Sequence, residues 1–240
     1  MKVLVTGAAG GIGAATVQLA VERGHAVIAT DQRFGPGHEG LDQVTQVECD
    51  LTRTDDLDAL AEAARELGVE AVIAAHGVVG AGALEELDDD RVRTILAVNA
   101  GAVPALFGAV RDTLRQNRGR FVVVTSIAAL RGERENSAYC ASKWAAQAWV
   151  GSMDAAEGPD GIAVRVLCPG RTDTEMLRRG TATIAEAVGQ TVEEYTETVM
   201  TQVPLRRYGR PREQAAAALY LAGAGVRAKA LAVTGGETTY

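Results

Sequence analysis

Short runs of apolar residues alternate with longer helical patterns along almost the whole chain of 240 residues. Each short run is apolar at consecutive positions and rich in Val or Ile, which is typical of strands buried on both faces of a sheet. We predict strands over Lys2–Thr6, Ala26–Asp31, Val44–Asp50, Ala71–Ala75, Arg120–Thr125, Ile162–Leu167 and Ala230–Thr234. Between them, a helical period of apolar residues predicts helices over Ile12–Arg23, Asp55–Leu67, Asp90–Asn117, Ser137–Ala156 and Arg212–Ala222.

The order of strand, helix and strand predicts the fold class. A helix that joins two parallel strands of one sheet forms a right-handed crossover, and repeated crossovers build a doubly wound sheet. We therefore expect an α/β fold, a Rossmann-like, doubly wound parallel sheet of about seven strands with helices on both faces. No linker or internal repeat interrupts the pattern, so residues 1–240 are predicted to form a single domain.

Two segments break the alternation. Gln32–Gln43 contains Gly and Pro and is too short for a good crossover helix, so we expect an irregular connection there. Residues 171–210 form a long insertion between the sixth strand and the last helix. Because long ordered insertions usually serve as lids or binding loops, we expect this one to line a substrate pocket, together with the loops Val78–Leu84 and Leu130–Asn136.

Composition excludes several classes of protein. Lys+Arg 24 against Asp+Glu 31 give a net charge of −7, which suits neither a nucleic-acid backbone nor an anionic membrane. The longest apolar stretches are interrupted by polar residues and are too short to span a membrane. The three cysteines, Cys49, Cys140 and Cys168, are widely spaced, which predicts a reducing, cytoplasmic location rather than a disulfide scaffold. Neither the cysteines nor the three histidines show the spacing of a metal site.

A glycine-rich segment, Gly7–Gly13, joins the first predicted strand to the first predicted helix. Glycine lets a backbone turn sharply and approach a ligand closely, and a helix N-terminus attracts phosphate. We therefore predict that Gly7, Gly11, Ile12 and Gly13 bind the pyrophosphate of a dinucleotide. The glycines are spaced Gly-x-x-x-Gly-x-Gly rather than Gly-x-Gly-x-x-Gly, and the alternative is a tight turn without a ligand.

Asp31 ends the second predicted strand, 18 residues after Gly13. An acidic residue near this offset accepts a hydrogen bond from the adenosine ribose of NAD and repels the extra phosphate of NADP. Arg33 leaves the alternative open, because an arginine there could accommodate that phosphate, although its position favours stacking near the adenine. We expect NAD as the cofactor and NADP as the less favoured alternative. A plain turn-forming role for Asp31 is the other interpretation.

Tyr139 and Lys143 are four residues apart at the start of a predicted helix, so both side chains lie on one face. A phenol ionises near pH ~10, and a neighbouring ammonium favours its deprotonated form. Ser126 follows the apolar strand at 120–125, on the sheet edge where parallel sheets bind ligands. Its hydroxyl could polarise a substrate carbonyl. Each feature alone has a simpler interpretation, a chance spacing for the pair and a capping serine for Ser126.

Together these motifs resemble the short-chain dehydrogenase/reductase family, and the resemblance covers nearly the whole chain. The family motif Thr-Gly-x-x-x-Gly-x-Gly matches Thr6–Gly13. Ser126 lies 13 residues before Tyr139, the family's common separation, and Tyr139-x-x-x-Lys143 matches its active-site motif. Asn99, in the predicted helix at 90–117, matches the family's active-site asparagine; on its own it would be taken as a buried helix asparagine.

The resemblance also implies further cofactor contacts. Asp50 and Leu51 match the pair that brackets the adenine in this family. Thr172 and Thr174 lie in a segment that resembles the family's Pro-Gly-x-Val-x-Thr motif at the nicotinamide carboxamide, although Thr172 replaces an apolar residue.

The family's Asn-Asn-Ala-Gly segment departs from its pattern here, because the chain reads Ala74-Ala75-His76-Gly77. Ala75 and Gly77 are carried over as cofactor contacts by position, but both amides are lost. We expect His76 to be a structural or adenosine-side neighbour rather than a catalytic group.

The resemblance implies an enzyme that transfers hydride reversibly between NAD and a secondary alcohol or ketone. Tyr139 would move the hydroxyl proton, and Lys143 would bind the nicotinamide ribose and lower the pKa of Tyr139. Ser126 would hold the substrate oxygen, and Asn99 would position a water relay. The resemblance further implies a homo-oligomer, a tetramer or a dimer, that contacts no nucleic acid or membrane.

Two alternatives remain at this point. A reductase of 3-oxoacyl thioesters is a frequent activity of this family, but it favours NADPH, against which Asp31 argues. A dinucleotide-binding sensor without catalysis is the alternative from another class, and it would not need aligned proton-transfer groups.

Overall fold

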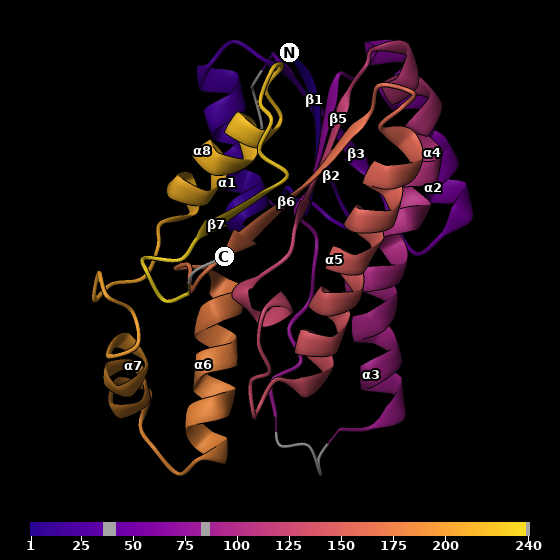
Figure 1. The fold of residues 1–240 in the computed structure, drawn as a ribbon. Coiled ribbons are helices and arrows are strands. Elements are labelled where there is room, and N and C mark those ends of the chain that lie inside the picture. Colours follow the sequence, from indigo (N-terminus) through magenta and orange to yellow (C-terminus); the bar gives the residue numbers. More distant parts are fainter. Residues whose placement is uncertain (36–41, 83–86, 239–240) are drawn as a thin grey trace.

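The computed structural model describes residues 1–35, 42–82 and 87–238. One sheet of seven parallel strands runs through the molecule in the order β3-β2-β1-β4-β5-β6-β7 (Figure 1). Its strands are β1 (Lys2–Thr6), β2 (Ala26–Asp31), β3 (Val44–Glu48), β4 (Ala71–Ala74), β5 (Arg120–Val124), β6 (Ala163–Pro169) and β7 (Ala230–Val233). The predicted seven-stranded, doubly wound α/β sheet is thereby confirmed.

Helices cover both faces of the sheet and add a layer beyond one edge (Figure 1). They are α1 (Gly11–Glu22), α2 (Thr54–Leu67), α3 (Asp89–Leu96), α4 (Ala102–Gln116), α5 (Ser137–Glu157), α6 (Glu175–Ala187), α7 (Val192–Met200) and α8 (Pro211–Leu221). Helices α1 and α8 pack on one face, whereas α2, α4 and α5 pack on the other.

Successive side chains of each strand point to opposite faces of the sheet, so they pack into two separate hydrophobic cores. In β1, Leu4 packs with α2, α4 and α5, whereas Val3 and Val5 pack with α1 and α8. On the α4 side, the Phe107 ring meets the Phe121 ring edge-on with 5.1 Å between their centroids. Because both faces are covered, the strands carry apolar residues at consecutive positions, which explains the pattern in the sequence.

The predicted helix Asp90–Asn117 is interrupted in the structure. It consists of α3, one π-helical turn η2 (Ala97–Gly101) and α4. A π turn inserts one extra residue into the helix and re-aims the side chains that it carries, here Asn99. The stretch Asp89–Gln116 is long and apolar enough to cross a membrane by composition alone, but its apolar side chains, such as Leu106 and Val110, pack on the sheet.

The predicted insertion at 171–210 contains α6 and α7, which lie below the sheet in Figure 1. Thr174 caps α6 by accepting a hydrogen bond from the Leu177 N–H at 3.2 Å. Of the predicted irregular connection, residues 32–35 and 42–43 lie in bends and turns, and 36–41 lie outside the described residues. The end of the predicted loop Val78–Leu84 also lies outside them.

Candidate active site

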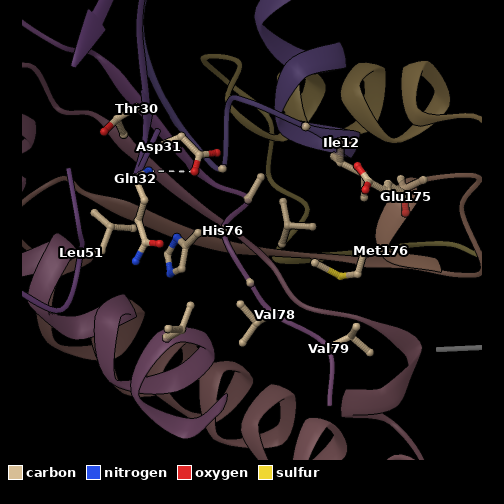
Figure 2. Close-up of a pocket in the computed structure, with 18 of the residues that line it drawn as sticks. Ile12, Thr30, Asp31, Gln32, Leu51, His76, Val78, Val79, Glu175 and Met176 are labelled. Atoms are coloured by element: carbon tan, nitrogen blue, oxygen red, sulfur yellow. Dashed lines mark hydrogen bonds between the residues drawn. The ribbon is translucent and has the colours of Figure 1, made fainter. Parts of the chain in front are cut away.

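A cavity of about 550 Å³ opens at the carboxyl ends of the strands, where the strand order reverses between β1 and β4. Parallel α/β sheets bind their ligands at this position. Figure 2 shows Asp31, Gln32 and Leu51 on one side of the cavity, Ile12, Glu175 and Met176 on the other, and His76 and Val78 between them.

The glycine-rich turn forms the cavity wall at the start of α1. Gly7 (φ +64°) lies against β4, so that a Cβ atom there would be 2.7 Å from the Ala75 carbonyl oxygen. A Cβ atom at Gly13 would be 2.0 Å from the Gly7 carbonyl oxygen. Gly13 therefore packs α1 on the turn and is not among the residues that line the cavity, unlike Gly7, Gly11 and Ile12.

The same turn leaves space for a phosphate. A Cβ atom at Gly10 would have no atom within 4 Å, and Gly10 faces the cavity. Helix α1 begins at the next residue, Gly11 (φ +52°), so its first N–H groups and the positive end of its dipole lie at this wall. The bare backbone and the helix start fit the pyrophosphate of a dinucleotide.

Acidic groups lie at the cavity rim next to the glycine turn. Asp31 Oδ2 accepts a hydrogen bond from the Ala9 N–H at 3.0 Å, and Oδ1 accepts one from the Gln32 N–H at 2.8 Å. The carboxylate is thus fixed to the glycine turn at the cavity rim. Arg33 is exposed and is not among the lining residues, whereas its neighbour Gln32 is.

Asp50 and Leu51, predicted to bracket the adenine, line the cavity with Asp31. Asp50 Oδ1 accepts hydrogen bonds from the Thr52 hydroxyl at 2.6 Å and from the Thr52 N–H at 2.9 Å. These hydrogen bonds hold the pKa of the Asp50 carboxyl below its ordinary value. The carboxylate is therefore ionised and held in place at neutral pH.

Tyr139, Lys143 and Ser126 lie together beside the cavity. Lys143 and Tyr139 both lie on α5, and the Lys143 Nζ atom is 5.6 Å from the centroid of the Tyr139 ring. Lys143 Nζ donates a hydrogen bond to the Val124 carbonyl oxygen at 3.3 Å. Ser126 follows β5, accepts a hydrogen bond from the Ala128 N–H at 3.1 Å, and hydrogen-bonds the phenol through its side chain.

Burial governs the protonation of both groups. It raises the pKa of the Tyr139 phenol to about 12, and the hydrogen bond with Ser126 acts in the opposite direction. Burial also lowers the pKa of the Lys143 ammonium to about 8. In the protein by itself, burial raises the pKa of the phenol, and Lys143 is not among the groups that lower it, contrary to the expectation from the sequence.

Asn99 holds the junction between β4 and α5. Its side chain is 2% exposed. Asn99 Oδ1 accepts a hydrogen bond from the Val78 N–H at 2.8 Å, and Nδ2 donates to the Val78 carbonyl oxygen and to Ser142 Oγ, both at 2.9 Å. These contacts use both amide hydrogens, and Asn99 is not among the lining residues of either cavity.

The segment after β4 lies over the same junction. A Cβ atom at Gly77 would be 3.2 Å from both Asn99 Oδ1 and Lys143 Nζ, so only glycine fits there without a shift. Ala75 and Gly77 both line the cavity, and the Ala75 N–H donates to Thr6 Oγ1 at 3.1 Å. The backbone of this segment therefore still lines the cavity, although the family's two side-chain amides are absent.

A second cavity of about 370 Å³ adjoins the first one. The two share Tyr139, Thr174 and Ile12, and Ser126 lines the second. The insertion at 171–210 supplies part of its wall, as do residues of the loop at 130–136. Thr172 is buried and lines this second cavity only, where its hydroxyl donates to the Gly170 carbonyl oxygen at 3.0 Å.

Several lining residues have no counterpart among the predicted contacts. Gln32 lies beside the predicted Asp31 in the sequence, so its neighbour gave the available signal. Met176 and Arg179 come from α6, within the insertion expected to line a pocket, but the sequence did not single out these two residues.

The comparisons with known proteins agree with this geometry. The model of the short chain dehydrogenase family matches residues 1–185. The chain is 34% identical to 2,3-dihydro-2,3-dihydroxybenzoate dehydrogenase of Escherichia coli (strain K12), over 92% of this chain and 89% of that protein. It is 32% identical to cis-4-hydroxycyclohexanecarboxylate dehydrogenase of Sinomonas cyclohexanicum, over 98% of this chain and 95% of that protein.

A solved structure of a variant of actinorhodin polyketide ketoreductase with NADPH superposes with a TM-score of 0.91 at 27% identity, covering 99% of this chain and 97% of that one. The fold, the glycine turn at the switch point and the grouping of Ser126, Tyr139 and Lys143 thus agree with the sequence matches. The chain belongs to the short-chain dehydrogenase/reductase family.

Proposed function

We propose that this oxidoreductase catalyses reversible hydride transfer between NAD and a secondary alcohol or ketone. The observation that carries the proposal is the position of Tyr139. Its phenol lies where the two cavities meet, hydrogen-bonded to Ser126 and above Lys143. A dinucleotide in the first cavity and an alcohol in the second would therefore both reach this group.

The first cavity offers groups for each part of the cofactor. Gly10 and Gly11 would hold the pyrophosphate, Asp31 the adenosine ribose, and Asp50 with Leu51 the adenine. Lys143 would donate to the nicotinamide ribose, and Thr174 would lie at the nicotinamide end. When bound, the nicotinamide ring supplies the site that accepts or donates the hydride and, when oxidised, a positive charge.

The chain's own groups handle the proton. Ser126 would hold the substrate oxygen while Tyr139 takes the hydroxyl proton on oxidation or returns it on reduction. Lys143 would keep a positive charge beneath the phenol and favour its deprotonated form. Asn99 would act by fixing the backbone at Val78 beside this group, because its side-chain amide hydrogens are already used.

We infer a preference for NAD from the carboxylate of Asp31, which would repel the phosphate of NADP. Arg33 does not line the cavity, so it offers no counter-charge to that phosphate in this arrangement. The rival is a 3-oxoacyl thioester reductase that uses NADPH, and the ketoreductase neighbour with NADPH favours it. Comparing kcat/KM for NADH and NADPH, and for cyclic and thioester ketones, separates the two functions.

Tyr139→Phe tests the proposal directly. This change removes the proton-transfer oxygen and keeps the ring, so turnover should fall by at least about a thousandfold. NAD affinity measured by calorimetry should change by less than about threefold. Tyr220→Phe is the matched control, because Tyr220 is 55% exposed on α8 and lies outside both cavities.

Retained turnover in Tyr139→Phe would refute the role of the phenol. Tight NAD binding by the unaltered protein, without turnover of any cyclic, aromatic or acyl alcohol, would instead support the dinucleotide sensor.

We also propose a cytoplasmic homo-oligomer, as expected from the sequence. The support for the oligomer is the exposure of three large apolar side chains on α3 and α5: Leu96, Trp144 and Trp149 are 38%, 50% and 44% exposed. Exposed apolar patches mark contacts between protein chains. Light scattering across a range of concentrations tests this, and a monomer at every concentration would contradict it.

A further inference from the structure

One wall of the second cavity is rich in arginine. Its charged lining residues are Arg131, Arg134, Arg171, Glu133 and Glu135. Three arginines face two glutamates there, and Glu237 behind the wall brings the formal charge of the group to zero, in a chain whose net charge is −7. Arg134 and Glu135 pair with each other at 3.4 Å, and Arg134 is 92% exposed. The partly covered charged groups of the wall are the cations Arg131 and Arg171 and the acids Glu133 and Glu135.

These two arginines are held by a carboxylate that lies behind them. Arg131 Nη2 forms an ion pair with Glu237 Oε1, and Arg171 Nε donates to the same oxygen at 3.2 Å. The Glu237 side chain is fully covered and is not among the residues that line the cavity. Glu133 Oε1 is farther away, 3.5 Å from Arg131 and 3.9 Å from Arg171. Glu237 thus orients both guanidinium groups without occupying the cavity.

Each guanidinium group has more donors than these contacts use. A guanidinium group carries five N–H donors in a planar fork, and the pair with Glu237 takes one nitrogen atom from each arginine. Arg131 is 35% exposed and Arg171 is 16% exposed, and both line the cavity. Two forks that converge on one space are the arrangement that recognises a carboxylate.

The rest of the cavity wall combines polar side chains with apolar ones and includes the proposed reacting group. Ile127, Pro169, Leu177 and Ile184 line the cavity, and so does Tyr139. A volume of about 370 Å³ admits a small ring or a short chain. A ligand there would be within reach of the arginines, of these apolar side chains and of the Tyr139 phenol.

We propose that the substrate is a small apolar ring or chain bearing both a secondary alcohol and a carboxylate, and that Arg131 and Arg171 bind the carboxylate. This inference rests on the proposed function. On oxidation, the carbinol C–H bond would break with its electron pair transferred as hydride to oxidised NAD, the O–H proton would pass to the deprotonated phenolate of Tyr139, a C=O double bond would form, and the carboxylate would be unchanged. Two relatives named above, a dihydrodihydroxybenzoate and a hydroxycyclohexanecarboxylate dehydrogenase, are named for compounds of this class.

A matched pair of substrates tests the inference on the unaltered enzyme. cis-4-Hydroxycyclohexanecarboxylate and its carboxamide have nearly the same shape and differ in charge. We expect kcat/KM to be at least about tenfold higher for the carboxylate, which is the effect of one or two charge-assisted hydrogen bonds. The difference in kcat/KM should come from KM rather than from kcat. It should decrease as salt is added, because both arginines are partly exposed.

The variants Arg131→Gln and Arg171→Gln assign the effect to the two residues. Each should raise KM for the carboxylate by about tenfold more than it raises KM for the carboxamide, because loss of the pairing with Glu237 affects both substrates alike. Calorimetry with cyclohexanecarboxylate in the presence of NADH gives the same comparison without turnover, and circular dichroism reports whether each variant is folded. Arg93→Gln is the control, since Arg93 is 72% exposed on α3 and lies outside both cavities.

Equal kcat/KM for the carboxylate and the carboxamide in the unaltered enzyme would overturn the inference. So would a preference that survives in both arginine variants. If neutral alcohols are oxidised but carboxylates are no better, the inference fails and the proposed function stands. If NAD binds but no alcohol of either kind reacts, the proposed function itself fails.

Discussion

Lys143 shows at the scale of one residue that the site is arranged for chemistry rather than for stability. Its side chain is 5% exposed, and burial lowers the pKa of its ammonium from the ordinary value of 10.5 to about 8. The folded chain therefore binds this proton less tightly than the unfolded chain does. Below pH 8 Lys143 is charged in both the folded and the unfolded chain. The full cost of burying this charge then lowers the free energy of unfolding.

The pH dependence of this cost follows from its sign. Between pH 8 and pH 10.5 the unfolded chain holds the proton and the folded chain does not, so stability rises with pH through that window. Lys143→Met should stabilise the ligand-free protein at pH 7 by about 3 kcal/mol and lose most of this advantage by pH 10. Urea unfolding of both proteins at pH 7 and pH 10 measures it. An advantage that does not change with pH would exclude titration of Lys143 as its cause.

His76 carries a second prediction at this scale, because its hydrogen bonds fix its tautomer. Thr6 Oγ1 accepts hydrogen bonds from the N–H groups of Ala75 and His76, at 3.1 and 3.3 Å, which uses both of its lone pairs. Its own proton must then go to His76 Nδ1, which lies 2.7 Å away. The remaining ring hydrogen is therefore on Nε2, which is buried and has no partner among the described residues.

Burial and the Lys143 ammonium lower the pKa of His76 to about 3. We expect a neutral imidazole with its proton on Nε2 at every pH from 5 to 9. A long-range ¹H–¹⁵N correlation spectrum of histidine-labelled protein distinguishes this state from the other tautomer and from the cation, and His76→Asn identifies the signal. A proton on Nδ1, or titration near pH 6, would contradict this account of the Thr6 hydrogen bonds.

At the scale of the elements, the sequence predicted what local patterns control. Strand β1 and strand β2 begin and end where the apolar runs do, since strands buried on both faces need apolar residues at every position. The π turn at 97–101 escaped prediction, because a single inserted residue shifts the phase of the apolar period too little to be recognised within a long helical pattern. Helices α6 and α7 were expected only as an insertion, and their mixed composition did not set their ends.

The site was predictable where chain position alone fixes a residue, as for Tyr139 and Lys143 on one helix face. The site was not predictable where the sequence does not decide whether a side chain points into the cavity or away from it. Arg33 does not line the cavity, whereas Gln32 does. Gly13 was predicted to contact the cofactor, but packing of α1 on the glycine turn decides its role. Such choices depend on neighbours that are distant in the sequence.

The glycine turn allows a prediction about how α1 is joined to β1. In Gly13→Ala the new methyl group would be 2.0 Å from the Gly7 carbonyl oxygen, and neither backbone segment can yield without moving the helix. We expect a loss of at least about 2 kcal/mol in unfolding free energy and no measurable NAD binding. In Gly10→Ala the methyl group meets no atom within 4 Å.

Gly10→Ala should therefore leave the unfolding free energy nearly unchanged and weaken NAD alone, because the methyl group would occupy space facing the cavity. Urea unfolding and calorimetry of both variants separate packing from ligand contact. Unchanged NAD affinity in Gly10→Ala would show that the pyrophosphate does not lie against this part of the turn.

At the scale of the whole molecule, one carboxylate ties together segments that lie far apart in the chain. Glu237, which follows β7, pairs with Arg131 after β5 and with Arg171 after β6. The same segment packs on the insertion, since the Leu205 N–H donates to the Gly235 carbonyl oxygen at 3.1 Å. The cavity proposed for the substrate is therefore braced from outside by residues that do not line it.

Because the Glu237 side chain is fully covered, its ion pairs should matter more than exposed ones. Glu237→Gln should lower the unfolding free energy by about 2–4 kcal/mol and speed hydrogen exchange at 131–136 and 171–173, where its partners lie. Glu22→Gln is the control, because Glu22 pairs with Arg212 at 52% exposure and such pairs contribute ~0–1 kcal/mol. Equal losses in the two variants would mean that Glu237 is one more surface ion pair. A larger loss for Glu237→Gln, with faster exchange confined to the two loops, would show that this carboxylate maintains the shape of the cavity.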